Sequence, residues 1–240
     1  MKRETYNKVI LIQGALDIET QYIINLLSEK SIREIAGYEF YEGTINHMKI
    51  VVSKTLVGTV NSTMATTIGI INFNPDMVIN QGIAGAHTKN LHVGDIVIGE
   101  KCCNINAYKM PIKNKGEGSN PFEWQPNKRA MEIQYANLQL VDIVVKNLVS
   151  KNKIYRGILG SGDVFNREYD RIVWVNKIFN TLCEDMESIG TYSVCNKFKI
   201  PCIGIRIISN NELLKEELNK EKATELQKLL IGMLDDLENI

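Results

Sequence analysis

Two glutamates in this chain hold positions from which a carboxylate could act on a sugar. Glu187 ends the segment Cys-Glu-Asp-Met-Glu at residues 183–187, directly before a helix-like run at residues 188–198. At the mouth of an α/β sheet, its carboxylate could accept two hydrogen bonds from vicinal sugar hydroxyls. An acid at a helix start is more commonly explained by the helix dipole. Glu19, one turn into an earlier helix, is by default a solvated surface residue, so neither acid alone favours either interpretation.

Five segments of the chain, four of them with glycine-containing turns, sit at or just past the expected carboxyl ends of strands. The segments are Gly14-Ala-Leu-Asp-Ile-Glu19, Thr55-Leu-Val-Gly-Thr-Val-Asn61, Asn80-Gln-Gly-Ile-Ala-Gly85, Gly160-Ser-Gly-Asp-Val-Phe165, and the stretch from Glu184 through Arg206 to Asn210. Open α/β sheets bind ligands at the carboxyl ends of their strands, so a shared site is expected there. Neither Gly14 nor Gly82 begins a complete dinucleotide fingerprint or phosphate loop. Phe165 could stack on a flat ring, although filling the core is its default use.

The elements that must position these segments alternate between short apolar runs and helical patterns, which is typical of an α/β fold. Strands are expected at residues 9–13, 38–42, 48–53, 77–80, 95–98, 158–160 and 201–209, with a turn at residues 82–85. Helices are expected up to residue 27 and at residues 61–73, 128–151, 171–179, 188–198 and 216–240, the last with an apolar stripe of helical period. Residues 109–128 are polar and are expected to form a long loop. Since no linker or repeat interrupts the pattern, we expect one domain over residues 1–240.

Composition excludes several classes of function. The chain has 240 residues with 28 basic and 28 acidic side chains, so nothing suggests a nucleic-acid partner. No apolar run approaches the ~20 residues of a membrane helix, and the amino terminus does not resemble a signal peptide. The five cysteines lack a paired spacing and are expected to be buried reduced thiols in a cytoplasmic protein. The three histidines lack metal-ligand spacing, so no metal is expected.

Taken in order, the glycine-containing segments resemble the purine nucleoside phosphorylase and nucleosidase superfamily, most closely its methylthioadenosine/S-adenosylhomocysteine nucleosidases. Residues 14–19 match that branch's Gly-Ala-Met-Glu-Glu-Glu, and residues 57–61 match its Ile-Gly-Lys-Val-Asn. Residues 78–85 and 93–97 match Ile-Asn-Thr-Gly-Ser-Ala-Gly and Val-Gly-Asp-Val-Val, while residues 161–163 and 185–187 match Ser/Thr-Gly-Asp and Glu-Met-Glu. The resemblance spans most of the chain and weakens between residues 104 and 130. It implies a single α/β domain with a central mixed twisted sheet flanked by helices.

The resemblance also implies roles for individual residues. Glu19 would activate the attacking water, and Glu187 would hold the ribose hydroxyls with Met186 packed against the sugar. Phe165 would stack on the purine, whose pairing edge would meet the backbone of Asn166. Further substrate-binding positions implied in this way are Ile83, Ala84, Gly85 and Asp185. The reaction would be cofactor-free hydrolysis of an N-glycosidic bond by a homodimer, through an oxocarbenium-like transition state that favours an anionic environment at the sugar.

The chain departs from this branch at Asn210, which is implied to be a catalytic position. The branch has Asp there, which protonates or hydrogen-bonds N7 of the departing adenine. A carboxamide cannot deliver a proton, and general acid catalysis contributes about 10²–10⁴-fold. Phosphorylases that act on 6-oxopurines resemble this chain in using Asn at that place, and an amide can pair with either kind of base. The preferred base therefore stays open.

Two further departures concern the nucleophile and a loop. Ile83 and Asn80 stand where phosphorylases place a serine and an arginine that bind phosphate. Since a buried dianion needs matched cations and donors, water is the favoured nucleophile, with a phosphorylase as the alternative. A non-catalytic nucleoside-binding protein is the alternative outside enzymes. Tyr108, Phe122 and Trp124 lie in the loop at residues 104–127, where they could cap a ligand or, more commonly, pack against the body or a second subunit.

Overall fold

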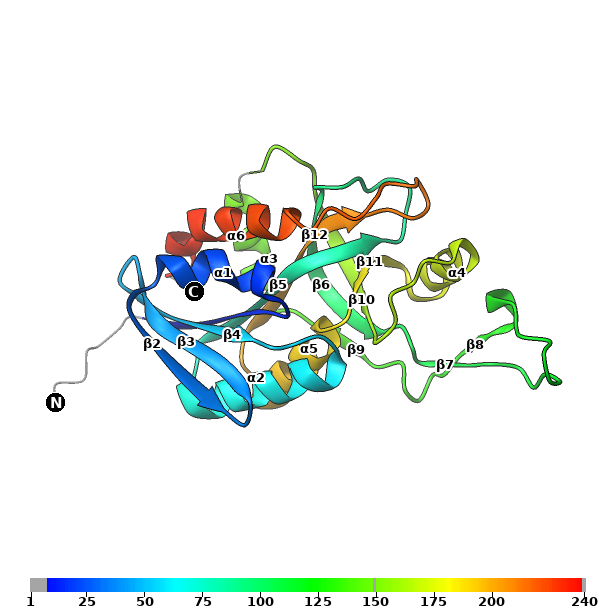
Figure 1. The fold of residues 1–240 in the computed structure, drawn as a ribbon, viewed down its shortest axis with the longest axis horizontal. Helices are drawn as coiled ribbons and strands as arrows, with labels where there is room; N and C mark the ends of the chain where they lie inside the picture. Colours follow the sequence, from blue (N-terminus) through cyan, green and yellow to red (C-terminus); the bar gives the residue numbers. More distant parts are fainter. Residues whose placement is uncertain (1–7, 149, 239–240) are drawn as a thin grey trace.

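One mixed β-sheet runs through the protein, and its central strands are the apolar runs of the sequence (Figure 1). The structure, a computed structural model, describes residues 8–148 and 150–238. The strands are β1 (Val9–Gly14), β2 (Ser28–Ile35), β3 (Tyr38–Ile45), β4 (Met48–Lys54), β5 (Met77–Ala86), β6 (Ile96–Asn104), β7 (Tyr108–Lys109), β8 (Gln125–Pro126), β9 (Ile133–Tyr135), β10 (Ile154–Ser161), β11 (Thr181–Asp185) and β12 (Cys202–Asn210). The main path is β11-β10-β6-β12-β5-β1-β4-β3-β2, and β9 pairs with β6.

Parallel pairing brings the ends of the central strands to one edge. β5 pairs in parallel with both β1 and β12, and β1 pairs in parallel with β4. The carboxyl end of β5 also pairs antiparallel with β11, which closes β5, β12, β6, β10 and β11 into a ring. The ends of β1, β5, β11 and β12 therefore lie close together, although they are far apart in the sequence.

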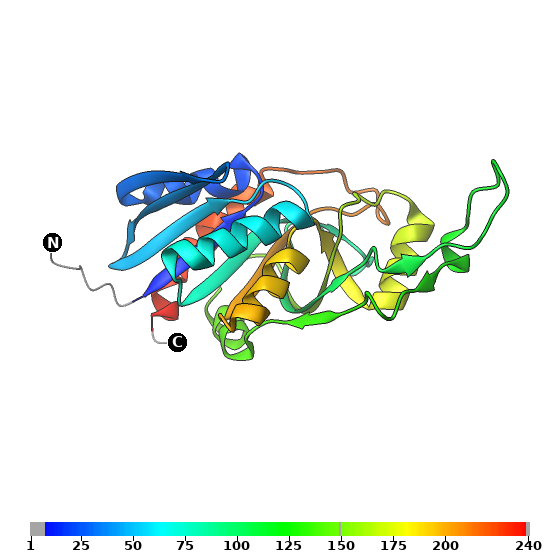
Figure 2. The same cartoon turned by 90° about the horizontal axis from the view of Figure 1, so that it is seen from below.

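Helices cover both faces of the sheet, as predicted. They are α1 (Asp17–Leu26), α2 (Thr59–Phe73), α3 (Leu138–Asn147), α4 (Tyr169–Phe179), α5 (Ser188–Phe198) and α6 (Lys222–Gly232), with short 3-10 helices η1 (Pro121–Glu123) and η2 (Leu234–Leu237). Figures 1 and 2 show α1 and α6 side by side on one face, with α2 and α5 on the other. The α/β class with a central mixed sheet is confirmed. No helix in the described part of the chain is long and apolar enough to cross a membrane.

Several predicted boundaries are wrong. The glycine segment at residues 82–85 is not a turn, because β5 continues to Ala86 where it meets β11 and β12. The helix predicted at residues 128–151 is β9 followed by α3 alone, with residue 149 outside the described part. The helix predicted at residues 216–240 begins at Lys222 and gives way to η2 after Met233, and residues 239–240 are again outside the described part. β2 had no apolar pattern to reveal it, since nearly all of its residues are exposed.

The long loop carries its aromatic side chains onto the body of the protein. The rings of Tyr108 and Trp124 stack with centroids 4.6 Å apart, and both meet Trp174 of α4 edge-on. This packing is the commoner of the two uses expected for the loop, and Phe122 stays exposed. The loop projects beyond α4 at the end of the molecule (Figures 1 and 2). All five cysteines are buried and reduced, as predicted.

Candidate active site

A cavity of about 250 Å³ opens at the edge where β1, β5, β11 and β12 end. Its lining includes every predicted site residue except Asn166. Those residues are Glu19, Ile83, Ala84, Gly85, Phe165, Asp185, Met186, Glu187 and Asn210. The topology therefore brings both glutamates to one cavity, which is the geometry that their predicted roles require. No Lys, Arg or His is among the described residues that line it.

Glu19 is a buried acid, so its default interpretation as a solvated surface residue is wrong. Its Oε2 accepts hydrogen bonds from the backbone amides of Ala15 at 2.8 Å and Leu16 at 3.1 Å, and its Oε1 accepts from Ile83 N–H at 2.9 Å. In the first two bonds, the acid in the first turn of α1 accepts from amides at the start of its own helix, as in a capping box. Burial raises the pKa of Glu19, although these amides and the charge of Arg206 oppose the rise.

Two glycines make room for this carboxylate. A Cβ on Gly82 would overlap Glu19 Oε1, and a Cβ on Gly14 would lie 2.9 Å from Glu19 Cβ. Neither residue has a positive φ, so the requirement here is space and not backbone conformation. The glycines of the first and third segments thus determine where Glu19 can point.

Glu187 sits at the start of α5 and faces the same cavity. Gly58 N–H donates to its Oε1 at 3.1 Å, and Met186 N–H donates to its Oε2 at 3.3 Å, so each oxygen keeps acceptor capacity for a ligand. Burial, followed by the negative charges of Asp185 and Glu19, raises the pKa of Glu187 to about 8. The acid is therefore largely protonated at neutral pH when the cavity holds no positive charge.

Asp185 reaches the cavity wall, but the protein itself occupies its carboxylate. Oδ1 accepts from Ser161 Oγ at 2.9 Å and from the amides of Glu187 at 2.9 Å and Ser188 at 2.8 Å. Oδ2 accepts from Ser188 Oγ at 2.7 Å and from Arg206 Nε at 2.9 Å. Although burial opposes ionisation, Arg206 and the Ser188 donors hold the pKa of Asp185 below its ordinary value. These contacts suit Asp185 to holding the backbone of Glu187 in place better than to contacting a substrate.

Arg206 is the residue to which sequence reasoning assigned no role. It is 1% exposed, and its remaining guanidinium hydrogens go to the Asn80 carbonyl at 3.0 Å, the Asn80 side-chain oxygen, the Ile205 carbonyl at 3.1 Å and Ser188 Oγ at 2.8 Å. The sequence could have indicated a role for Arg206, because it places a cation inside the apolar run Ile-Gly-Ile-Arg-Ile-Ile and a buried charge needs a partner. It supplies the positive charge that offsets three neighbouring acids.

The opposite end of the cavity carries the residues predicted to meet a base. Phe165 is half exposed, and Asn210 Oδ1 accepts from Ser209 Oγ at 3.0 Å. Asn166 is buried and does not line the cavity, and its backbone N–H donates to Glu184 Oε1 at 2.8 Å, so its predicted contact with a base stays a prediction. Glu184, which does line the cavity, was not among the predicted site residues.

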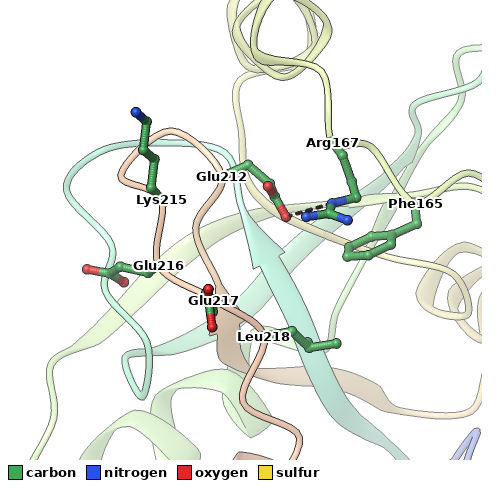
Figure 3. A pocket seen from close by; sticks show the side chains of 7 residues that line it. All are labelled: Phe165, Arg167, Glu212, Lys215, Glu216, Glu217 and Leu218. Carbon is green, nitrogen blue, oxygen red and sulfur yellow. Dashed lines mark hydrogen bonds and ion pairs between the residues drawn. The ribbon is translucent and has the colours of Figure 1, made fainter.

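A second cavity, of about 490 Å³, adjoins the first at Phe165 and Leu218. Figure 3 shows the charged residues around it, where Arg167 Nε pairs with Glu212 Oε1 at 3.2 Å. Neither cavity offers a metal site. In residues 8–148 and 150–238, no three His, Cys, Asp or Glu side chains form a group that could hold a metal ion.

Comparison with known proteins matches residues 9–237 to the phosphorylase superfamily. The chain is 32% identical over 243 residues to a 5′-methylthioadenosine/S-adenosylhomocysteine nucleosidase of Buchnera aphidicola subsp. Schizaphis graminum, covering 95% of this chain and 98% of that protein. Among solved structures, the Neisseria meningitidis nucleosidase of the same name in complex with methylthio-immucillin-A has a TM-score of 0.79 at 21% identity, covering 97% of this chain and 100% of that one.

A futalosine hydrolase mutant of Helicobacter pylori strain 26695 also superposes, with a TM-score of 0.79 at 22% identity, covering 95% of this chain and 99% of that one. The two structures share this chain's fold. Since their names give different substrates, the fold alone does not determine what occupies the cavity.

Proposed function

Because this chain belongs to the phosphorylase superfamily, with 5′-methylthioadenosine/S-adenosylhomocysteine nucleosidases as its relatives, we propose that it is a hydrolase of N-glycosyl compounds. The bond cleaved is the N-glycosidic bond of purine nucleosides such as 5′-methylthioadenosine and S-adenosylhomocysteine. The products are the free purine base and a thioribose sugar.

The observation that carries this proposal is that the buried Glu19 and the half-buried Glu187 line one cavity. Glu19, whose pKa is raised by burial, is a stronger base than an exposed glutamate and is suited to take a proton from an attacking water. Glu187 keeps acceptor capacity on both oxygens, which suits a pair of vicinal ribose hydroxyls. The two acids would then lie on opposite sides of one sugar.

The electrostatics of the cavity suit an oxocarbenium-like transition state. Although burial opposes it, the carboxylates of Asp185, Glu187 and Glu19 raise the pKa of Arg206. Glu187 is largely protonated when the cavity holds no positive charge, and positive charge that develops beside it favours its ionised form. Positive charge that develops on the sugar would therefore be stabilised by acids already fixed in place. Asp185 holds the Glu187 amide and Arg206 together, so it acts as a positioning residue in this proposal.

Water is the nucleophile in this proposal, because nothing in the cavity suits a dianion. The side chain of Ile83 is apolar, and the Arg206 hydrogens already have protein partners. A phosphate would lack the cations and donors that offset its desolvation. The phosphorylase alternative is accordingly not favoured.

The test is base release by the purified protein from 5′-methylthioadenosine, with and without phosphate, followed by chromatography of base and sugar. We expect free base and free sugar at rates independent of phosphate. Formation of a sugar 1-phosphate only when phosphate is present would identify a phosphorylase instead. Tight binding measured by calorimetry without any base release would identify a non-catalytic nucleoside-binding protein.

We further propose that the enzyme works in the cytoplasm as a homodimer and serves methionine salvage. Five buried thiols are compatible with a reducing compartment. Val60 and Met64 of α2 are exposed, as are Leu56 and Val57 just before this helix, and Val57 also lines the cavity. This apolar patch suits a second copy of the chain. Sedimentation of the unmodified protein should give twice the mass of one chain, whereas the Val60→Glu variant should give the mass of a single chain. A single-chain mass for the unmodified protein would contradict the dimer.

A further inference from the structure

The start of α2 lies against the carboxylate of Glu187. Gly58 N–H donates to Glu187 Oε1 at 3.1 Å, so the place of this N–H decides where one oxygen of the acid is held. Gly58 is also the N-cap residue of α2, with a φ of 108°, and glycine has no side chain with which to cap the helix. Whatever fixes the start of α2 therefore also fixes one oxygen of Glu187.

Asp163 caps α2 from a distant part of the chain. Its Oδ1 accepts from Thr59 N–H at 2.7 Å, and its Oδ2 accepts from Thr59 Oγ1 at 2.6 Å, although Thr59 lies 104 positions earlier in the sequence. A carboxylate is favoured at this end of a helix, because the free N–H groups there carry positive charge. Asp163 and Glu187 thus hold consecutive amides, those of Thr59 and Gly58, at the start of one helix.

The segment that carries Asp163 also holds the backbone of Glu187. Ser161 Oγ donates to Asp185 Oδ1 at 2.9 Å, and Gly162 N–H donates to the Asp185 carbonyl at 3.1 Å. Asp185 Oδ1 in turn accepts from Glu187 N–H at 2.9 Å. The Ser-Gly-Asp segment therefore reaches Glu187 twice, at its backbone through Asp185 and at its carboxylate through α2.

Close packing between α2 and α5 transmits a shift of α2 to Glu187. The two helices lie side by side on one face of the sheet (Figure 2). Ser62, one turn into α2, donates from Oγ to the Glu187 carbonyl at 2.7 Å. A Cβ on Gly190 of α5 would overlap the same Oγ, so the helices already touch there. A start of α2 that lost its cap would consequently move against the sugar end of the cavity.

On the basis of the proposed hydrolase function, we propose that Asp163 is a positioning residue for the sugar. By capping α2 it holds Gly58 N–H, and through it the Glu187 carboxylate, where the vicinal ribose hydroxyls meet that acid. Asp163 is not among the described residues that line the cavity, so it acts through Glu187 and not on the nucleoside itself. A cap that only stabilised α2 would affect every nucleoside alike, whereas a displaced Glu187 affects only those that carry the hydroxyls.

The test compares kcat/KM for 5′-methylthioadenosine with that for its 2′,3′-dideoxy analogue, which lacks both hydroxyls. In Asp163→Ala the value for the ribonucleoside should fall by about threefold to thirtyfold, the effect of losing a helix cap, while the value for the analogue stays the same. The ratio of the two should therefore fall by that factor. Asp163→Asn keeps an oxygen for Thr59 N–H and should restore most of the ratio.

Two further variants make the comparison strict. Asp170→Ala is the matched control, because it removes an exposed acid from the first turn of another helix, α4, and it should leave the ratio unchanged. Thr59→Val removes only the bond to Asp163 Oδ2 and keeps the amide bond to Oδ1. It should lower the ratio by a smaller factor, and it replaces Asp163→Ala if that variant does not fold.

The outcomes separate this inference from the proposed function. Equal losses for both nucleosides, or an unchanged ratio, in Asp163→Ala or its replacement would overturn the positioning role and leave the hydrolase intact. Release from neither nucleoside by the unmodified protein would overturn the hydrolase. A crystal structure of the same variant without ligand then decides the positioning role independently of activity: loss of the bond from Gly58 N–H to Glu187 Oε1 supports it, and retention of that bond at 3.1 Å refutes it.

Discussion

Replacing Glu187 by glutamine should flatten the dependence of folding stability on pH. The folded protein raises the pKa of Glu187 from its ordinary 4.5 to about 8, because of burial and the charges of Asp185 and Glu19. Between these pH values the folded state holds a proton that the unfolded state releases. Stability contributed by this group is therefore present in full below pH 4.5 and is lost as the pH rises toward 8.

The magnitude follows from the size of the shift. One bound proton changes the free energy of unfolding by about 1.4 kcal/mol per pH unit, so the whole interval amounts to about 5 kcal/mol at most. Between pH 5 and 8, the free energy of unfolding should fall more steeply with pH in the unmodified protein than in Glu187→Gln, by up to about 1.4 kcal/mol per pH unit. Glutamine keeps the shape and the acceptor for Gly58 N–H, so the change isolates the titration.

The assay is urea unfolding at pH 5, 6, 7 and 8 without ligand. Glu19 titrates in the same direction and leaves Glu187→Gln some residual slope, whereas Glu217→Gln, at an exposed position, should keep the full slope. Equal slopes for Glu187→Gln and the unmodified protein would refute the reasoning. A rise in stability from pH 5 to 8 that Glu187→Gln leaves unchanged would do the same.

Three substitutions test the cavity kinetically. Glu19→Gln should lower kcat at least about 10²-fold while calorimetry shows unchanged ligand affinity, since it removes a proton acceptor and keeps the shape; retained turnover would rule out Glu19 as the base. Gly82→Ala should lower kcat similarly because its Cβ would displace Glu19 Oε1, whereas Gly232→Ala, with open space around it, should not. Asn210→Asp should raise adenine release by about 10² if a missing acid limits that reaction, and no gain would mean either that residue 210 is not at the base or that another group compensates.

Sequence pattern was sufficient for β1, β4 and β12 and for the convergence of the five segments, whereas β6 and β10 are longer than predicted and β11 was not predicted. The helix predicted at residues 188–198 has those bounds in the structure, because an acid precedes it and a clear apolar strand follows. β2 could not be predicted from periodicity, since an exposed edge strand buries nothing. The end of β5 was mistaken for a turn because glycine favours turns, while here glycine makes room for Glu19 and for a ligand.

The positions of the remaining site residues depend on strand pairing that cannot be read from the sequence. Glu184 lies beside the recognisable Asp-Met-Glu segment, but only the register of β11 against β5 brings it opposite Asn210. Asn166 was expected to meet a base with its backbone, and in the structure its amide N–H donates to the buried carboxylate of Glu184. Contacts between strands distant in sequence determine both outcomes.

A crystal structure of Glu19→Gln with an intact 5′-methylthio nucleoside would test the central claim most directly. The account predicts that the ribose lies between residue 19 and Glu187, with both vicinal hydroxyls about 2.7 Å from the Glu187 carboxylate and a water between residue 19 and C1′. A sugar bound elsewhere, or bound with either of these two side chains turned away from it, would contradict the account.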